Sequence, residues 1–420
     1  MSFAQKYIKG LFQSRKRNIE RINEQVPGSE YYSMQHFISE SPWEYQPGFD
    51  KVAGDATRLF EAFEWVGLLI DETAHTKKGE DSVGVSRQWS GQLGKVDNCQ
   101  VSVMAALSTG RYYCPIDTRL FLPESWTKDK KRCLRAGVPK ERLKHQTKQE
   151  LALEMVIHQR KIGTRFEWVG CDGLYGHDSW FSNQLDDLGE CFMLDVHSDQ
   201  PVYLTPPTLA VPERKSKKGK APTQIQSSEQ SVKVRNLIES IPEHQWEQHV
   251  LRESPNGKPL KAHFWFKTVY VWDGFEDQSR ERMLIIRRDT CSKSFEYKYS
   301  LTNATEGTFL HVRLARMQGQ RFFIEQSIKD SKQEVGMSQY QVRGWLAWHH
   351  HMVLVMMSMY FILSEKVLYK KEIPLLSAYD IRELMITTYS KKANSTHEVL
   401  EQIRSRHRQR QGNHDLQLKT

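Results

Sequence analysis

Two short, mostly apolar runs constrain the fold of this chain most strongly, because each of them ends abruptly at an aspartate. The first run covers residues 65–70 and is followed by Asp71, and the second covers residues 166–171 and is followed by Asp172. A short run without polar alternation is typical of a strand that is buried on both faces of a sheet. The two runs therefore predict two buried strands, each with a carboxylate at its end.

Neighbouring segments predict the rest of a mixed sheet. Residues 101–107, 112–122 and 191–196 are further strand candidates, and residues 140–161 have the pattern of a helix. Strands that are followed by a helix and then by more strands are typical of an α/β domain with a mixed sheet. We therefore predict an α/β fold with a mixed sheet.

The segments that flank this sheet have other patterns. Residues 1–60 are helical in pattern and rich in bases, which leaves open a DNA-contacting or dimerising module and a solvated amphipathic helix. Residues 206–222 predict a basic, mobile loop, and the aromatic and β-branched residues 250–288 predict a small antiparallel β insertion. Residues 341–369 predict a buried apolar helix, and the residues from about 392 predict a frayed basic tail.

The composition limits the class of protein. The 420 residues carry a formal net charge of +9, which favours a polyanionic partner such as nucleic acid. The longest apolar stretch, residues 352–363, is shorter than the ~20 residues of a membrane span, so we expect a cytoplasmic protein. Six scattered cysteines fit neither a disulfide framework nor a zinc module: Cys99, Cys114, Cys133, Cys171, Cys191 and Cys291.

Asp71 and Asp172 are candidate metal ligands because of their position. A rigid strand presents its terminal side chain to solvent, and ligands tend to bind outside strand ends in α/β sheets. A carboxylate that follows an apolar run is unfavourable to bury unless a cation meets it. The alternative is that each aspartate only caps the next turn, so the interpretation as a site requires a third carboxylate.

Glu325 is the candidate for that third carboxylate. It shares one helix face with three bases, Arg321, Lys329 and Lys332, because these residues are spaced by four, four and three positions. Such a face could bind a metal and a nucleic-acid backbone, or it could be a ladder of ion pairs that only stabilises the helix. Glu334 is the rival carboxylate, but it faces the opposite side of the helix. Two aspartates and a glutamate form an all-oxygen set that suits Mg²⁺.

Several blocks of the chain resemble those of the DDE transposases of bacterial insertion sequences. The first begins at Asp71 and reads DETAHTKKG, the second begins at Asp172 and reads DGLYG, and the third, RFFIEQSIKDSK, contains Glu325. The similarity is greatest to insertion sequence family seven-zero-one, with a β insertion before the final glutamate, and it covers nearly the whole chain. Further matching stretches lie at residues 17–21, 35–43, 82–88, 94–100, 336, 340–343 and 348–350.

The resemblance implies an RNase-H-like core in which Asp71, Asp172 and Glu325 bind the catalytic metals. It also implies that Arg321 and Lys332 hold DNA phosphates near the cleaved end, because they match the arginine and lysine of a Tyr-Arg-Glu-Lys signature. The chain departs from this pattern in three places: Gln318 replaces the tyrosine, and Glu72 and Ala74 replace residues that are more often aspartate and glycine.

Other residues are weaker candidates for DNA contacts. Lys77 and Lys78 follow the first aspartate closely and could touch DNA or lie in a solvated turn. Lys329 could be a third phosphate contact or an ion-pair partner of Glu325. Trp265 and Trp272 in the β insertion could stack on a flipped base, but strand packing is the simpler interpretation.

Together, the residues and the resemblance predict a DNA transposase that cuts and joins DNA strands. Two Mg²⁺ ions per site, or Mn²⁺ in their place, would support phosphodiester hydrolysis and then attack by the freed 3′ hydroxyl. The expected partners are double-stranded DNA with terminal inverted repeats, target DNA and a second copy of the chain, at the bacterial nucleoid and without a membrane. A host RNase-H-like DNA nuclease and a non-catalytic, domesticated DNA-binding protein stay open as alternatives.

The predicted organisation of the chain has five parts. They are an N-terminal helical DNA-binding or dimerisation region (1–60), the first part of the RNase-H-like core (61–200), the basic loop and β insertion (201–300), the rest of the core with C-terminal helices (301–370), and a C-terminal region with a basic tail (371–420).

Overall fold

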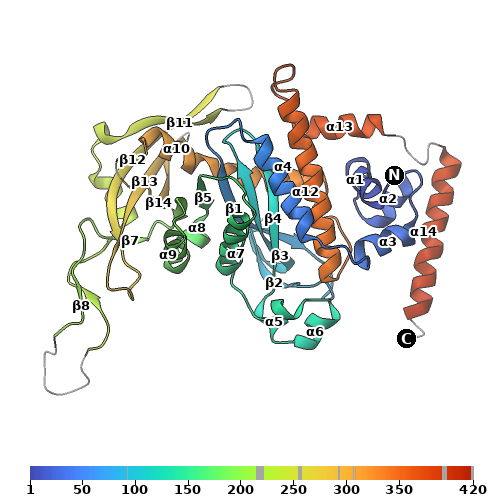
Figure 1. Cartoon of the computed structure of the whole chain (residues 1–420), viewed down its shortest axis with the longest axis horizontal. Coiled ribbons are helices and arrows are strands. Elements are labelled where there is room, and N and C mark those ends of the chain that lie inside the picture. The colour runs from blue at the N-terminus through green and yellow to red at the C-terminus, as the bar shows by residue number, and fades with distance from the viewer. Residues whose placement is uncertain are drawn as a thin grey trace.

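The computed structural model describes residues 1–91, 93–213, 222–253, 258–291, 294–305, 307, 309–389 and 395–417. Its centre is a ten-stranded sheet with the strand order β11-β12-β13-β14-β6-β5-β1-β3-β2, in which β4 also pairs with β3 (Figure 1). The strands are β1 (Gly67–Thr76), β2 (Ser86–Ser90), β3 (Lys95–Ser108), β4 (Tyr113–Phe121), β5 (Trp168–Cys171), β6 (Phe192–Val196), β11 (Glu247–Glu253), β12 (Pro259–Val271), β13 (Arg280–Cys291) and β14 (Ser294–Thr302).

Five of these strands, in the order β4-β3-β1-β5-β6, form the part of the sheet that carries the candidate site. β3 runs antiparallel to both β1 and β4, whereas β5 pairs in parallel with both β1 and β6. A sheet with an antiparallel half and a parallel half is the mixed architecture expected of an RNase-H-like core. The structure therefore confirms the predicted fold class.

Close packing between β1 and β5 fixes their register. Residues Leu68, Leu69 and Ile70 are fully buried, as the continuous apolar run requires. Gly67 lies opposite Trp168 in the parallel pair, and a Cβ on Gly67 would lie 2.5 Å from the Trp168 ring. A glycine at this position therefore allows the two strands to approach each other.

Helices cover both faces of this sheet. Consecutive side chains of a strand point to opposite faces, and Asp71 and Glu72 follow that rule on β1. Asp71 faces the residues at the start of α11 (Phe322–Gln333), and Glu72 faces the start of α7 (Lys148–Lys161). α7 and α11 therefore lie on opposite faces of β1.

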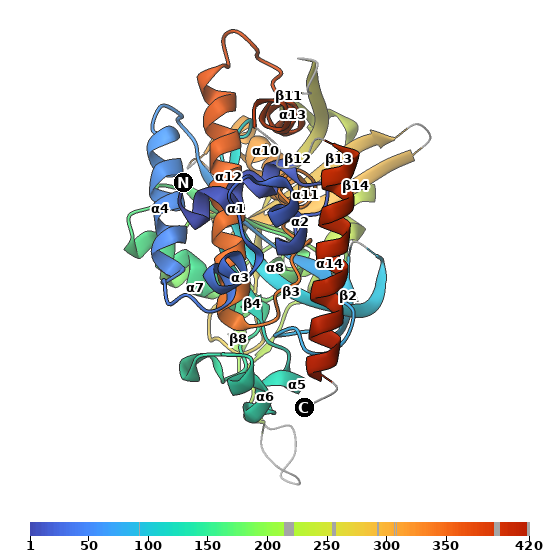
Figure 2. The ribbon, with the colours of Figure 1, turned by 90° about the vertical axis from the view of Figure 1, so that its right-hand side faces the viewer.

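The N-terminal region is helical, as predicted. Its helices are α1 (Phe3–Gln13), α2 (Ile19–Gln25), α3 (Tyr31–Ser39) and α4 (Gln46–Leu59). They pack around the long helix α12 (Trp345–Leu368), which passes through the centre of the view in Figure 2. Histidines of α12 bind this region: the ring nitrogens of His350 lie 2.8 Å from the carbonyl oxygens of Ile38 and Trp43, and Nδ1 of His351 lies 2.9 Å from the Tyr7 hydroxyl.

Among the described residues, α12 is the one helix that is long and apolar enough to cross a membrane. Its side chains are nevertheless buried from Trp345 through most of its length, where they contact α1, α3, α4 and β4. The prediction of a buried apolar helix in this segment is confirmed.

The short elements and connecting helices complete the description. They are α5 (Glu124–Thr127), α6 (Lys130–Arg135), η1 (Lys140–Arg142), α8 (Gly173–Gly176), α9 (Ser179–Asp187), β7 (Pro201–Val202), β8 (Leu209–Ala210), β9 (Gln226–Ser227), β10 (Val232–Lys233), η2 (Val234–Ser240), η3 (Glu243–Gln245), α10 (His311–Gln320), α13 (Ala378–Thr388) and α14 (Thr396–Gln417).

The β insertion is larger than the sequence predicted, and it is part of the main sheet. Its strands β11–β14 form an antiparallel meander, and β14 pairs with β6 so that Ser300 lies opposite Asp195. The insertion therefore extends the core sheet at the open edge of β6. The indole nitrogens of Trp265 and Trp272 donate hydrogen bonds to Gln245 and to the Glu276 carbonyl, which agrees with a packing role.

The sequence predicted a basic loop and a frayed basic tail, and the structure describes the first only in part and the second from residue 395 to residue 417. Residues 214–220, the basic part of the loop predicted at residues 206–222, lie outside the described residues, whereas residues 209 and 210 of that segment form β8. The predicted frayed tail is a helix, α14, which contacts α2: Arg406 forms an ion pair with Glu24 at 2.8 Å, and Gln402 donates to the Glu24 carbonyl. These contacts explain why the segment is helical rather than frayed.

Candidate active site

Asp71 lies inside β1, not at its end. The apolar run does end at Ile70, but pairing with β3 continues the strand to Thr76. Parallel pairing between β1 and β5, in contrast, ends at Ile70 and Cys171. Because Asp71 and Asp172 are the next residues on the two neighbouring strands, they emerge side by side where the strands part.

Asp172 both caps a helix and faces the site. Its Oδ1 accepts a hydrogen bond from the backbone nitrogen of Leu174 at 3.0 Å, which makes it the N-cap of α8. The alternative interpretation from the sequence, that Asp172 only caps the next turn, is therefore half right. Asp172 is a cap, but its second carboxylate oxygen is still available to the site. α8 also packs tightly on β6: a Cβ on Gly176 would lie 1.9 Å from the carbonyl oxygen of Asp195.

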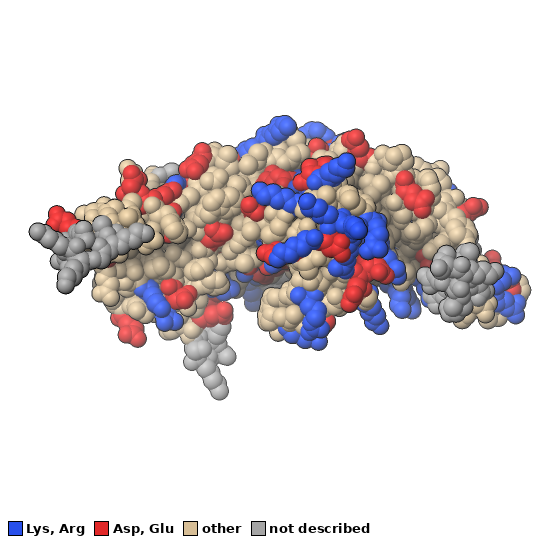
Figure 3. Space-filling view, turned by 90° about the horizontal axis from the view of Figure 1, so that it is seen from below, with Lys and Arg blue, Asp and Glu red and all other residues tan. Residues whose placement is uncertain are grey.

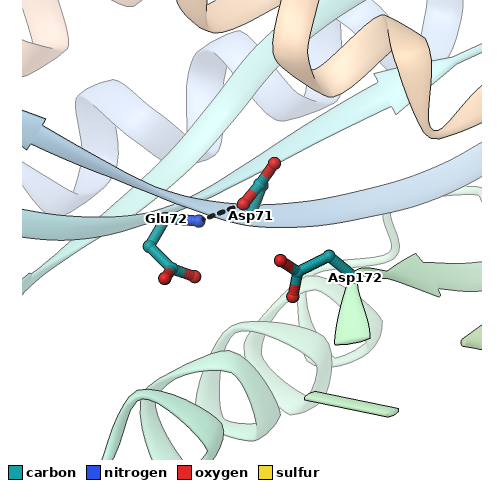
Figure 4. Close-up of side chains that lie close together, drawn as sticks. All are labelled: Asp71, Glu72 and Asp172. Carbon is teal, nitrogen blue, oxygen red and sulfur yellow. Dashed lines mark hydrogen bonds between the residues drawn. The ribbon is translucent and has the colours of Figure 1, made fainter. Parts of the chain in front are cut away.

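Three carboxylates meet at this point. One oxygen each from Asp71, Glu72 and Asp172 lies within 4.8 Å of the others. Figure 4 shows Asp71 and Glu72 pointing to opposite sides of β1, with Asp172 beside them. Glu72 pairs with Lys148 at 3.1 Å through Oε1, while its Oε2 is buried and has no hydrogen-bond partner within the described part of the chain.

The environment of Asp71 opposes its negative charge. The pKa of Asp71 is raised to about 8, with burial as the largest cause and the charges of Asp172 and Glu72 as further causes. Arg321 and a hydrogen bond from the Glu72 backbone act in the opposite direction without cancelling the shift. Like-charged carboxylates that are held together in this way favour a cation between them.

Arg321 links the acids that come from different strands. Its Nε lies 2.8 Å from Oδ2 of Asp195, one of its terminal nitrogens lies 2.8 Å from Oε1 of Glu325, and the other lies 3.8 Å from Oδ2 of Asp71. Arg321 sits between α10 and α11, as the C-cap of the first helix and the N-cap of the second. A single guanidinium thereby compensates three carboxylates.

Glu325 lies beside this cluster rather than in it. Half of its side chain is exposed, and its carboxylate binds Arg321 four residues earlier. The structure therefore brings Asp71 and Asp172 together as expected, but Glu72 occupies the third position and Glu325 is connected through Arg321. The ion pair between Arg321 and Glu325, which the sequence offered as the alternative to a catalytic role, is formed in this structure.

Asp195 is the site residue that the sequence analysis missed. It lies partly buried on β6, and this desolvation raises its pKa, while Arg321 and a hydrogen bond from Ser300 oppose that shift. Ser300 donates to Oδ1 of Asp195 at 2.6 Å, and Gln318 donates to Ser300 at 2.8 Å. The signal was present, since Asp195 interrupts the apolar strand candidate at residues 191–196 just as Asp71 and Asp172 follow theirs.

Two of the predicted DNA-binding lysines point into the protein. Lys332 donates to the carbonyl oxygen of Ala74 on β1 at 3.0 Å, and Lys77 donates to the carbonyl oxygen of Tyr340 at 3.1 Å. Burial lowers the pKa of Lys332 to about 8 and that of Lys77 to about 7. Both amines therefore support the backbone around β1 and α11 in this structure.

Three further candidates from the sequence lie outside the carboxylate cluster. Lys329 and Lys78 are exposed. Glu334, the rival of Glu325, pairs with Arg382 at 3.0 Å and accepts a hydrogen bond from Arg17 at its carbonyl, away from the carboxylate cluster.

The chemistry of the donor set fits a hard divalent cation. The carboxylates of Asp71, Glu72 and Asp172 supply oxygen ligands alone, which Mg²⁺ and Mn²⁺ prefer over softer donors. The buried, unbonded Oε2 of Glu72 and the raised pKa of Asp71 are both relieved when a cation lies among them.

A mixed RNase-H-like sheet with two adjacent aspartates on its parallel strands defines a metal-dependent nuclease class. The sequence profile of the DDE superfamily endonucleases matches residues 3–258, and the chain belongs to that family. The matched residues include Asp71 and Asp172, while Glu325 lies beyond them.

One relative makes the resemblance more specific. The chain is 26% identical over 193 residues to the "Probable transposase for insertion sequence element IS701" of Microchaete diplosiphon. The alignment covers 46% of this chain and 47% of the relative, so the match spans about half the length of each protein. The predicted resemblance to DDE transposases of this insertion-sequence family is confirmed.

Proposed function

We propose that this protein is a DNA transposase that cuts and joins DNA strands at the ends of an insertion sequence. The observation that carries the proposal is the parallel register of β1 and β5, which puts Asp71 and Asp172 side by side in a chain of the DDE family. The similarity to a probable IS701 transposase supports strand transfer in addition to cleavage.

In this proposal, Asp71 and Asp172 are the fixed ligands of the divalent metal. A bound pair of Mg²⁺ or Mn²⁺ ions activates the attacking oxygen and stabilises charge at the phosphorus and at the leaving oxygen. Asp71 gives up its proton when the cation binds, because burial and its acidic neighbours keep it protonated otherwise. Asp172 remains oriented by its hydrogen bond to Leu174.

Glu325 completes the site by exchanging partners. It is half-exposed and on the same face of β1 as Asp71, and Arg321 now holds its carboxylate. When a DNA phosphate binds Arg321, the guanidinium gains a bidentate anionic partner, and Glu325 would then be free to join Asp71 and Asp172 as a metal ligand. Asp195 keeps Arg321 anchored during this exchange through the contact at Nε.

The reaction requires DNA ends and target DNA, and joining two ends favours a homodimer. The terminal inverted repeats of the element are the expected cleavage substrates, and target DNA is the expected acceptor. A bacterial protein with this task works in the cytoplasm at the nucleoid. Lys329 and Lys78, which are exposed, are the remaining candidates for phosphate contacts from the resemblance.

A cleavage and strand-transfer assay tests the proposal. The substrate is DNA from the borders of the gene, with Mg²⁺ or Mn²⁺, and the variants are Asp71→Asn, Asp172→Asn and Glu325→Gln. Each should abolish nicking while DNA binding persists, and Asp187→Asn, at an exposed position away from the cluster, should nick normally. Cleavage without joining would favour the host nuclease, and metal-independent DNA binding without cleavage would favour the domesticated binding protein.

A further inference from the structure

The most basic segment of the chain runs from the end of α5 through α6 and η1 to the start of α7. Residues 128–148 contain nine lysines and arginines and two acidic residues, a formal net charge of +7, compared with +9 for all 420 residues. Such a concentration of like charge destabilises a compact chain unless a polyanion neutralises it. The formal net charge outside this segment is the difference between +9 and +7, so the remaining residues are together nearly neutral. Most of the net positive charge of the protein thus belongs to this one segment.

Some of these bases have structural partners. Lys128 pairs with Glu124, and Arg142 pairs with Glu154. Arg132 donates to a backbone carbonyl and lies over the Trp126 ring at 3.9 Å.

The remaining bases define what we call the basic surface: Lys130, Lys131, Arg135, Lys140 and Lys144. All five side chains are exposed, and none of them forms an ion pair with another residue in the described part of the chain. Asp129, which lies among them, is used as the N-cap of α6. The positive charges of the basic surface are therefore available to bind an anionic partner.

The basic surface adjoins the candidate active site. Lys148, at the first position of α7, pairs with Glu72 of the carboxylate cluster at 3.1 Å. Only three residues separate Lys144 from Lys148, so one end of the basic surface is close to the cluster along the chain. Figure 3 views the molecule from the side on which α5 and α6 lie in Figure 1, and lysines and arginines gather in the middle of that face.

The other basic segment that the structure describes is a poorer candidate. In α14, Arg404 pairs with Glu401 and Arg406 pairs with Glu24. Both arginines thus use their charge within the protein, whereas the five bases of the basic surface form no ion pair in the described part of the chain.

We propose that the basic surface holds duplex DNA that flanks the cleaved phosphate. This proposal rests on the proposed function, and it names where the substrate lies. A row of exposed lysines and arginines beside the metal ligands suits the regular phosphate charges of a duplex, with one charge per ~1.7 Å of helix axis. Its contacts go to the backbone, so they position DNA without reading its sequence.

Paired charge substitutions test the basic surface. The test variant is Lys130→Gln with Lys131→Gln, and the matched control is Lys370→Gln with Lys371→Gln, which are also adjacent, exposed lysines. The control pair follows α12, whose end lies at the opposite edge of the molecule from α6 in Figure 1. Binding of a short DNA duplex of arbitrary sequence is measured by fluorescence anisotropy over a range of salt concentrations.

The basic surface predicts a specific pattern of results. The Lys130/Lys131 variant should bind about tenfold more weakly at 0.1 M salt, and the slope of log affinity against log salt should fall by about 2, while the control pair changes neither. Equal affinities and slopes for the two variants would overturn the basic surface and leave the proposed function intact. Tighter binding of an RNA duplex of the same sequence would also overturn it.

A second measurement separates this proposal from the function on which it rests. At saturating DNA, the Lys130/Lys131 variant should nick at the wild-type rate, because the metal ligands are untouched. A wild-type protein that binds the duplex through Lys130 and Lys131 but never nicks DNA would overturn the transposase and retain the surface. Loss of nicking at saturating DNA in this variant alone would contradict a role confined to docking.

Discussion

Arg321 lies 2.8 Å from Asp195, and this ion pair connects the helix that carries Glu325 to strand β6. Asp195 is partly buried and receives a further hydrogen bond from Ser300, and these contacts hold its carboxylate in place. Arg321 in turn contacts Asp71 and Glu325. The position of Asp195 therefore controls where the guanidinium, and through it the last carboxylate, is held.

Asp195→Asn should misplace Arg321 without removing a metal ligand. Loss of a charge-assisted contact of this kind is worth about 1.5–3 kcal/mol, so the KM for DNA should rise at least tenfold. Metal affinity should stay within about twofold of wild type. Ser300→Ala, which removes the supporting hydrogen bond alone, should have the same effect at a smaller size. Weakened metal binding with an unchanged KM would make Asp195 a metal ligand instead.

Glu72→Gln and Glu325→Gln distinguish the two candidates for the third carboxylate. Glu72 lies in the cluster in this structure, whereas the proposed function requires Glu325 to join it after Arg321 changes partners. Glu72→Gln should therefore lower metal affinity in the absence of DNA, with a smaller effect on nicking. Glu325→Gln should leave that affinity unchanged and abolish nicking. The reverse result, measured by calorimetry and by the cleavage assay, would assign the catalytic role to Glu72.

Metal binding should release a proton below about pH 8. The pKa of Asp71 in the metal-free protein is raised from 3.8 to about 8, so its carboxyl is protonated at neutral pH and must ionise to bind a cation. Affinity should therefore increase with pH, by up to tenfold per unit, until the pH passes about 8. Calorimetry in buffers of different ionisation enthalpy measures the released proton, which Asp71→Asn should eliminate. An affinity that is constant from pH 6 to 8 would contradict the raised pKa.

The same shift predicts how stability depends on pH. A carboxyl whose pKa is higher in the folded than in the unfolded chain lowers stability as the pH rises from the unfolded value of 3.8 through about 8. In EDTA, Asp71→Asn should therefore raise the Tm more at pH 9 than at pH 4. Equal shifts at both pH values, measured by thermal unfolding, would mean that Asp71 ionises without penalty.

Gly176→Ala should disturb the site through the backbone. The new methyl group would meet the Asp195 carbonyl at 1.9 Å, so α8 and β6 must separate. We expect a loss of about 3 kcal/mol in unfolding free energy and a marked fall in nicking, because Asp172 and Asp195 both move. Gly173→Ala, whose methyl would lie 3.3 Å from the His197 ring, is the matched control and should lose less than about 1 kcal/mol. Similar losses for both would exclude the close approach as the cause.

The sequence predicted the core of this site because burial leaves a strong pattern. Continuous apolar runs identified β1 and β5, and the aspartates that follow them lie together. The predicted end of β1 was wrong, because pairing with β3 extends the strand past Asp71. The added residues include polar ones, which do not continue the apolar run. Asp195 was missed because its partner, Arg321, lies far away in the sequence and only the sheet brings them together.

Charge was harder to predict than burial. Lys332 and Lys77 were candidates for DNA contacts, yet their amines bind backbone carbonyls, because a long aliphatic chain lets lysine reach inward. The basic surface was not recognised, since the helix candidate at residues 140–161 divided its bases between two segments. Whether a lysine faces solvent depends on tertiary contacts, and periodicity alone does not determine these.

The position of the insertion also affects the order in which the protein is made. β1, β5 and β6 have all left the ribosome before the strands β11–β14 are translated, and α11 follows only after them. At ~5–20 residues per second, the two aspartates can meet several seconds before Arg321 and Glu325 are synthesised. A nascent chain at that stage therefore lacks Arg321 and Glu325, the two residues that the proposed function assigns to a DNA phosphate and to completing the site. Under that proposal, DNA cleavage begins only after the insertion has been translated.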